Sequence, residues 1–325
     1  MTADRNQAVG ARRVRAGDAH AGQRLDNFLL RELAGVPRSR VYRLLRRGEI
    51  RVNGKRKQAD YRLAADDEVR LPPMRGEARI SGDAPRRVPD SLIAAVRAAI
   101  VQEDPRLLVL DKPAALAVHG GSGLSYGAIE ALRALRPEES LELVHRLDRD
   151  TSGCLLVARS RTALKLAHAL MREGAVEKHY AALVAGRWLL GRKTIDAPVL
   201  THAREGGERV VRVHRAGKVA LSIFDVAERY RGIATLMDVA IRTGRTHQIR
   251  VHAAFAGHPV AGDEKYGDRE CNARLRALGL RRMFLHASSI SFHWPDTGAL
   301  FRAECPLPPE LAAVLARLRA QPAQG

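Results

Sequence analysis

The feature that most constrains the fold is a break in the apolar pattern after the sequence LPP. The stretch that follows, MRGEARISGDAPRRVPDS, has no helical or strand periodicity and is rich in proline, glycine and charge, which is typical of linkers. We therefore predict a linker over residues 76–92, between a small domain, residues 15–75, and a larger one, residues 93–325. Residues 1–14 are polar, arginine-rich and aperiodic, so we predict a disordered tail there.

The charge balance indicates an acidic partner. The 325 residues include 55 Lys and Arg against 36 Asp and Glu, a formal net charge of +19, and such an excess usually accompanies a polyanion. An acidic membrane surface is the alternative, but no apolar run approaches the roughly 18 residues of a spanning helix and the N-terminus lacks a signal-peptide core. We therefore expect a nucleic acid as partner and no membrane association.

Basic residues gather in the small domain. Apolar residues recur at helical spacing in DNFLLREL and again in RVYRLLRR, and EIRVNGKRK then alternates like a strand entering a turn. The second helix would carry its arginines opposite its apolar face. A charge run of this kind is often only a solvated surface, but the net charge of the chain favours binding to a polyanion. The candidate nucleic-acid-binding residues are Arg38, Arg40, Arg43, Arg46, Arg47, Arg51, Lys55, Arg56 and Lys57.

The larger domain alternates helix and strand signals without a fixed repeat. LLVLDKP, YAALVAG and ATLMDVAI read as strands, and ALKLAHALMREG reads as an amphipathic helix. No GxGxxG follows a first strand and no GxxxxGK[ST] occurs, so neither a dinucleotide nor a P-loop nucleotide is indicated. We predict the α+β class, with a mixed, largely antiparallel sheet in this domain and a small α/β domain before it.

Cysteine and histidine residues give no metal signal. Cys154, Cys271 and Cys305 lie far apart in the sequence without paired spacing. HQIRVH lacks the glutamate and the spacing of a zinc-binding HExxH helix. We expect unpaired thiols in a reducing cytoplasm and no metal ion.

The stretch VHRLDRDTSG carries the strongest candidate for chemistry. Asp148 follows the apolar alternation LELV, and Thr151 or Ser152 before Gly153 predicts a turn, so the carboxylate should lie on a loop at a strand end. Nearby arginines stabilise the charged form of a carboxylate, which could then act as a base or a nucleophile. The alternative is that Asp148 only pairs with an arginine or caps the turn.

Two parts of the sequence resemble known protein families. Residues 20–73, with a basic second helix, IRVNG and a final DEVRLP, resemble the S4 RNA-binding domain, which implies an RNA anchor without chemistry of its own. Residues 98–310 contain LLVLDKP, AVHGGSG, HRLDRDTSG, KHYAALV, TGRTHQIRVHAAFAGHPVAGDEKYG and FLHASSISF in order. This part resembles the RluA group of pseudouridine synthases, which implies cofactor-free isomerisation of uridine within RNA.

The resemblance also implies roles for individual residues. It makes Asp148 the catalytic aspartate and Arg146 the arginine that fills the stack left by a flipped base. Tyr180 would stack on the uracil, Arg245 would pair with the aspartate, and Leu285 would contact the base from below. A flipped base needs such a filler and an aromatic platform. THQIRVHAAFAG fits a helix capped by Thr246, which would set Arg245 at the helix N-terminal edge.

The resemblance further implies the partner and the cellular setting. The expected partner is 23S ribosomal RNA or a large-subunit assembly intermediate, bound by a cytoplasmic monomer without an obligate protein partner. A non-catalytic S4-type RNA-binding factor and a synthase acting on tRNA remain as alternatives. Which uridines are modified, and whether Asp148 attacks the sugar or removes a sugar proton, stay open.

Overall fold

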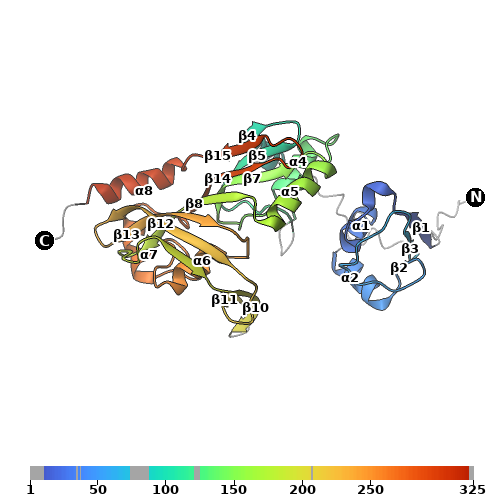
Figure 1. Cartoon of the computed structure of the whole chain (residues 1–325), viewed down its shortest axis with the longest axis horizontal. Coiled ribbons are helices and arrows are strands. Elements are labelled where there is room, and N and C mark those ends of the chain that lie inside the picture. Colours follow the sequence, from blue (N-terminus) through green and yellow to red (C-terminus); the bar gives the residue numbers. More distant parts are fainter. Residues whose placement is uncertain are drawn as a thin grey trace, which may run out of the picture. The chain divides into compact units, whose positions relative to one another are not determined.

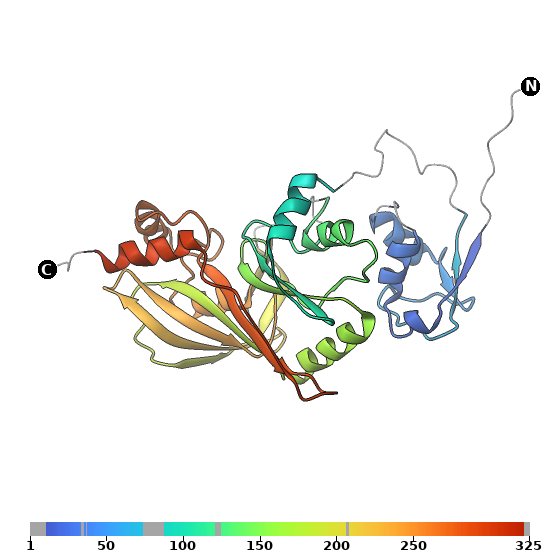
Figure 2. The ribbon, with the colours of Figure 1, turned by 90° about the horizontal axis from the view of Figure 1, so that it is seen from above.

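The computed structural model describes residues 11–33, 36, 38–73, 88–120, 125–205 and 208–321. The chain divides into two compact units, Met1–Arg87 and Val88–Gly325; Figures 1 and 2 show both units in two views. Among the described residues no helix is long and apolar enough to cross a membrane.

The N-terminal unit packs two short helices on a small antiparallel sheet. The helical pattern predicted from sequence is confirmed, because Leu25, Phe28 and Leu29 of the first helix and Val41 of the second form one buried cluster. The described strands of the sheet lie in the order β1-β3-β2. The elements are β1 (Arg12–Arg15), η1 (Asp18–His20), α1 (Leu25–Glu32), α2 (Arg38–Arg47), β2 (Arg51–Val52) and β3 (Glu68–Leu71).

The domain boundaries differ from the predicted ones at two places. The predicted tail ends at residue 14, but Arg12 already belongs to β1, which pairs with β3 at the far end of the unit. The predicted linker, residues 76–92, overlaps helix α3, which begins at Asp90. The part of this linker from residue 76 to residue 87 lies outside the described residues.

The C-terminal unit is built on one large mixed sheet. Its main path is β4-β5-β7-β14-β8-β13-β12-β9, with β15 beside β14 and β6 beside β7. The described pairings are antiparallel except for β7 with β14, so the predicted α+β class with a largely antiparallel sheet is confirmed. The strands are β4 (Ile100–Glu103), β5 (Leu107–Lys112), β6 (Glu142–Leu143), β7 (Ser152–Ala158), β8 (Glu177–Ala185), β9 (Lys193–Asp196), β12 (Leu221–Tyr230), β13 (Ala234–Ile241), β14 (Leu285–His293) and β15 (Leu300–Glu304).

The two faces of this sheet bury different cores, as the alternation of side chains along a strand requires. Along β8, Tyr180 and Ala182 belong to the main core, whereas Leu183 belongs to a second core on the other face. Helices α3 (Asp90–Ala98), α4 (Ala128–Leu135) and α5 (Arg161–Glu173) contribute to the main core. Helices α7 (Arg269–Ala277) and α8 (Pro309–Arg319) cover the second core.

Helix α6 (Gln248–Phe255) lies beside a separate hairpin, β10 (Val199–Glu205) with β11 (Glu208–Val213). Val251 of α6 shares a small buried cluster with Val199 and Val211 of the hairpin. This cluster packs the helix against the hairpin.

The three cysteines are buried free thiols. Although Cys154 and Cys305 are distant in sequence, their Sγ atoms lie 3.1 Å apart. The expectation of unpaired thiols is confirmed, and the two Sγ atoms come close because β7 and the end of β15 meet beside β14.

Candidate active site

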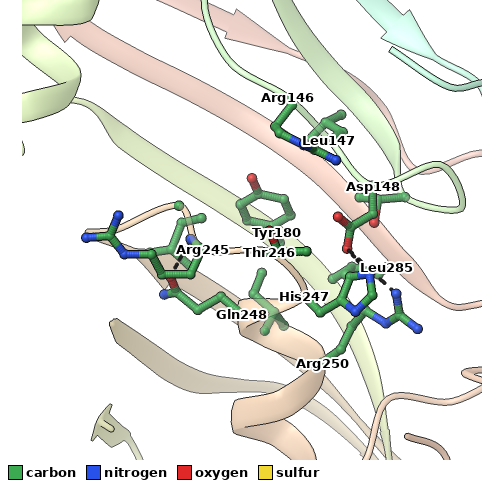
Figure 3. Close-up of a pocket in the computed structure, with 14 residues that line it drawn as sticks. Arg146, Leu147, Asp148, Tyr180, Arg245, Thr246, His247, Gln248, Arg250 and Leu285 are labelled. Atoms are coloured by element: carbon green, nitrogen blue, oxygen red, sulfur yellow. Dashed lines mark hydrogen bonds and ion pairs between the residues drawn. The ribbon is translucent and has the colours of Figure 1, made fainter. Parts of the chain in front are cut away.

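Asp148 lies in the loop between β6 and β7, at one side of a pocket in the C-terminal unit (Figure 3). The backbone N–H of Thr151 donates to the Asp148 carbonyl at 3.2 Å and closes a turn. The loop position is as predicted, but β7 begins at Ser152, so the turn lies earlier than the one predicted at Gly153. The Asp148 side chain is 19% exposed, so a substrate can reach it.

Gly153 allows β7 to approach β14 closely. Its φ is +106°, and a Cβ at this position would lie 2.1 Å from the carbonyl oxygen of Ala287. Only glycine fits there without a shift of the backbone. The close approach brings the loop of Asp148 next to Leu285, the first residue of β14.

A buried lysine donates a hydrogen bond to the same loop. Lys112, at the end of β5, is fully buried, and its Nζ donates to the carbonyl oxygens of Pro113 at 2.9 Å, Leu116 at 2.8 Å and Arg149 at 3.0 Å. Burial lowers the pKa of Lys112 to about 7, although the charges of Asp150 and Asp148 oppose the shift. In the sequence, LLVLDKP indicates only a strand, and nothing in it predicts these hydrogen bonds.

Stability should therefore depend on Lys112 and on pH. The folded state releases the lysine proton near pH 7, whereas an unfolded lysine keeps it to about pH 10.4. The unfolded state binds more protons between these values, so the free energy of unfolding should rise with pH across this window. In Lys112→Met this rise should disappear. At pH 9 the neutral amine has two N–H groups, so two of the three carbonyls lose a donor, which should cost about 1–3 kcal/mol.

Urea unfolding at pH 7 and pH 9 measures both effects. The control is Lys165→Met on the exposed face of α5, which should keep the wild-type pH dependence. Equal pH dependence in Lys112→Met and wild type would contradict the role given to this lysine.

Tyr180 and Leu285 line the pocket from neighbouring central strands. Tyr180 lies on β8 opposite Ala287 of β14, and Leu285 lies opposite Ala182. The Tyr180 side chain belongs to the core, with only 7% of the residue exposed. Burial, and next the charge of Asp148, raise the pKa of Tyr180 well above its usual range. The phenol is therefore neutral, and its ring and Leu285 form an apolar wall beside Asp148.

Arg250 of α6 is the basic residue next to Asp148. Its Nη1 lies 3.7 Å from Oδ2 of Asp148. Its Nε and Nη2 donate to both carboxylate oxygens of Asp263 at 2.7 and 2.8 Å. Burial opposes ionisation of Asp263, but the hydrogen bonds and charge of Arg250 outweigh it, so the pKa of Asp263 lies below its usual range. A bidentate pair thus orients the guanidinium that faces Asp148.

The prediction that Arg245 pairs with the aspartate is wrong. Arg245 lines the pocket, but its Nε donates to the carbonyl of Val219 at 3.0 Å, and Figure 3 shows its guanidinium directed away from Asp148. Helix α6 begins at Gln248 with His247 as its N-cap, one residue later than predicted. The buried part of this helix carries Arg250 to Asp148, whereas Arg245, before the helix, reaches the backbone of Val219.

The arginines of the HRLDRD stretch do not hold Asp148 either. Arg149 pairs with Asp150 at 3.5 Å, and both side chains are exposed. Arg146 is exposed at the edge of the pocket (Figure 3), and among the described residues no carboxylate pairs with it. Its guanidinium is thus available to a ligand.

The predicted basic residues lie on the surface of the N-terminal unit. Arg56 donates to the carbonyl of Arg46, and Arg51 donates to the carbonyl of Gly48 at 3.3 Å, so the turn after β2 lies against the end of α2. The side chain of Arg38 lies outside the described residues, and those of Arg40 and Lys57 are half-buried. The exposed side chains are Arg43, Arg46, Arg47, Arg51, Lys55 and Arg56.

Comparison with known proteins agrees with this fold and site. The model of the RNA pseudouridylate synthase family matches residues 106–255, and the model of the S4 domain matches residues 23–69. The chain belongs to the RNA pseudouridylate synthase family and carries an S4 domain before its synthase domain. The predicted family and domain types are therefore confirmed.

Individual relatives match over most of this chain. The chain is 50% identical to ribosomal large subunit pseudouridine synthase C of Pasteurella multocida over 317 residues, 97% of this chain and 96% of that protein. It is 51% identical to the protein of the same name from Escherichia coli K12 over 302 residues, 92% and 94% of the two chains. The solved structure of human RNA pseudouridylate synthase domain containing 4 matches with a TM-score of 0.59 and 27% identity, over 71% of this chain and 96% of that one.

Proposed function

We propose that this protein converts specific uridines of large-subunit ribosomal RNA to pseudouridine, with Asp148 as the residue that acts on the nucleotide. The observation that carries the proposal is the pocket itself: a reachable carboxylate faces a buried tyrosine ring and a leucine, with an oriented guanidinium behind it. We infer large-subunit ribosomal RNA as the substrate from the names of the relatives. The setting we infer is the cytoplasm, with the protein acting as a monomer on 23S RNA or an assembly intermediate.

The pocket suits a base that has left its stack. A base within folded RNA must be flipped out before its glycosidic bond can be reached, at a cost of a few kcal/mol. Tyr180 and Leu285 offer a flat apolar surface for the uracil ring. Arg146 at the edge offers a planar cation that can stack where the base was.

Asp148 would act on the ribose as its carboxylate form. Attack on C1′ and removal of a sugar proton both require that form, and the charged guanidinium of Arg250 faces it at 3.7 Å. Orientation of Arg250 by Asp263 keeps this charge in place throughout the reaction.

The basic surface of the S4 domain would anchor the RNA through phosphates. Removal of one basic side chain that binds a phosphate should flatten the plot of log affinity against log salt by about 0.7–0.9. Replacing the exposed pair on α2, Arg43→Gln with Arg47→Gln, should lower the slope by about 1.4–1.8 if both side chains bind phosphate. Filter binding to ribosomal RNA at several salt concentrations measures this slope.

The matched control removes two charges from the sheet of the same unit, Arg13→Gln with Arg70→Gln, which face each other across β1 and β3. We expect this variant to keep the wild-type slope. Identical slopes in the α2 variant and the wild type would show that the basic surface only keeps the protein in solution.

Chemical mapping of pseudouridines in cells with and without the protein tests the proposed function. Specific sites should disappear from large-subunit RNA and none from tRNA. Loss of tRNA sites alone would favour a tRNA synthase, and an unchanged map would favour a non-catalytic RNA-binding factor.

A further inference from the structure

The proposed isomerisation requires proton transfers beyond the action of Asp148 on the ribose. The bond between N1 and C1′ breaks and a bond between C5 and C1′ forms. The product then has no proton on C5 and one more on N1. A group beside the base must therefore take a proton from C5 while N1 receives one.

Few side chains around the pocket can take that proton. Its arginines remain protonated at any accessible pH. Tyr180 is neutral and deprotonates only far above neutral pH, because burial and the charge of Asp148 raise its pKa. Of the described residues that line the pocket, this leaves Asp148, which the proposed function assigns to the ribose, and His247, whose imidazole can accept a proton at neutral pH.

His247 is held with its imidazole directed toward Asp148 (Figure 3). Its Nδ1 lies 2.8 Å from the hydroxyl oxygen of Tyr266, and its Nε2 lies 3.8 Å from Oδ2 of Asp148. Its φ is +54°, a left-handed conformation that is uncommon for residues other than glycine. Although His247 occupies the N-cap of α6, its side chain makes no capping hydrogen bond, so helix capping does not explain the histidine.

We propose that His247 is a further catalytic residue, whose Nε2 accepts the proton that leaves C5. The inference rests on the proposed function. After C5 has bonded to C1′, the C5–H bond breaks and its electron pair forms the C5=C6 double bond. The pair of the C6=N1 bond moves to N1, which takes a proton, and the imidazolium returns its own proton to water or to N1. No co-reactant is consumed.

The surroundings keep the ring oriented and neutral before this step. Nδ1–H can donate to the Tyr266 hydroxyl, which leaves the lone pair of Nε2 free. The charged groups that face His247 are Asp148 on its loop, Arg250 on α6, and Asp263 and Lys265 on the loop after the helix. Burial has the largest effect and lowers the pKa of His247 below its usual value, despite the opposing charge of Asp148. The neutral base is therefore present at neutral pH.

The test uses His247→Asn in the full-length protein. Asparagine tolerates a positive φ and can still bond Tyr266, but it lacks Nε2. Ribosomal RNA carrying protium or deuterium at C5 of uridine is converted in single turnover. We expect the rate to fall about 10²–10⁴-fold, with RNA affinity unchanged and a larger ratio of protium to deuterium rates than in wild type. The control, His293→Asn on the exposed end of β14, should behave as wild type.

A second variant covers a failure of the first to fold. Tyr266→Phe removes the partner of Nδ1 and should lower the rate about 10-fold with the same rise in the isotope ratio. A wild-type isotope ratio in the folded variants, with or without a loss of rate, would overturn the proposal. A residue with only a structural role has no reason to slow the step that breaks the C5–H bond more than the other steps. If the wild-type protein leaves C5 deuterium in ribosomal RNA, the proposed function itself fails.

Discussion

Replacing Asp148 by asparagine is expected to abolish pseudouridine formation and to leave RNA affinity almost unchanged. The substitution removes the charge but hardly any volume, and the turn with Thr151 uses the backbone of residue 148. Loss of a carboxylate that takes part in the reaction should cost several orders of magnitude in rate. Affinity depends mainly on binding to phosphates, so removal of one negative charge could strengthen binding slightly. Single-turnover conversion and filter binding measure the two quantities.

A neighbouring aspartate provides the control for this variant. Asp150 is exposed and pairs only with exposed Arg149 among the described residues, so Asp150→Asn should retain wild-type turnover. Wild-type turnover in Asp148→Asn would remove the aspartate from the mechanism.

Replacing Arg250 by methionine should lower the free energy of unfolding and also slow the reaction. The Asp263 side chain has no exposed surface and would lose its bidentate partner. A buried carboxylate left without its partner typically costs about 3–5 kcal/mol. The pKa of Asp263 is lowered in the folded protein, so the contribution of the pair exists at neutral pH and is lost as the pH falls through the folded pKa. Urea unfolding at pH 7 measures the loss.

Two further variants separate stability from chemistry. Arg250→Met combined with Asp263→Asn removes both charges and keeps an acceptor for the backbone N–H groups of Lys265 and Tyr266. It should recover part of the stability, but not the rate, because Asp148 still lacks its guanidinium. Arg245→Met should change the free energy of unfolding by less than about 1 kcal/mol, since its Nε bonds only a backbone carbonyl near the surface. Equal destabilisation in Arg245→Met and Arg250→Met would contradict the assignment of Arg250.

Local patterns in the sequence predicted much of the fold and part of the site. Helical spacing identified α1 and α2, and the change in composition near residue 73 separated the two units. The loop position of Asp148 followed from the apolar alternation before it. The family resemblance supplied Tyr180 and Leu285, which the structure brings into one pocket with Asp148.

Contacts between distant segments could not be predicted in this way. Lys112 reaches the carbonyl of Arg149, and Arg250 pairs with Asp263, only because the sheet and α6 bring them together. The sequence near residue 12 does not reveal strand β1, because its partner, β3, lies about 55 residues later in the chain. One local signal in the sequence does point to these two residues: in HQIR, His247 and Arg250 are three residues apart, as on one face of a helix.

Conversion of purified large-subunit RNA by the purified protein tests the central claim most directly. RNA from cells that lack the protein is incubated with the wild type or with Asp148→Asn, and every pseudouridine is then mapped. We predict that the wild type restores the sites missing from those cells, and no others, whereas Asp148→Asn restores none. Failure of the wild type to form pseudouridine, or equal restoration by the variant, would contradict this account of the site.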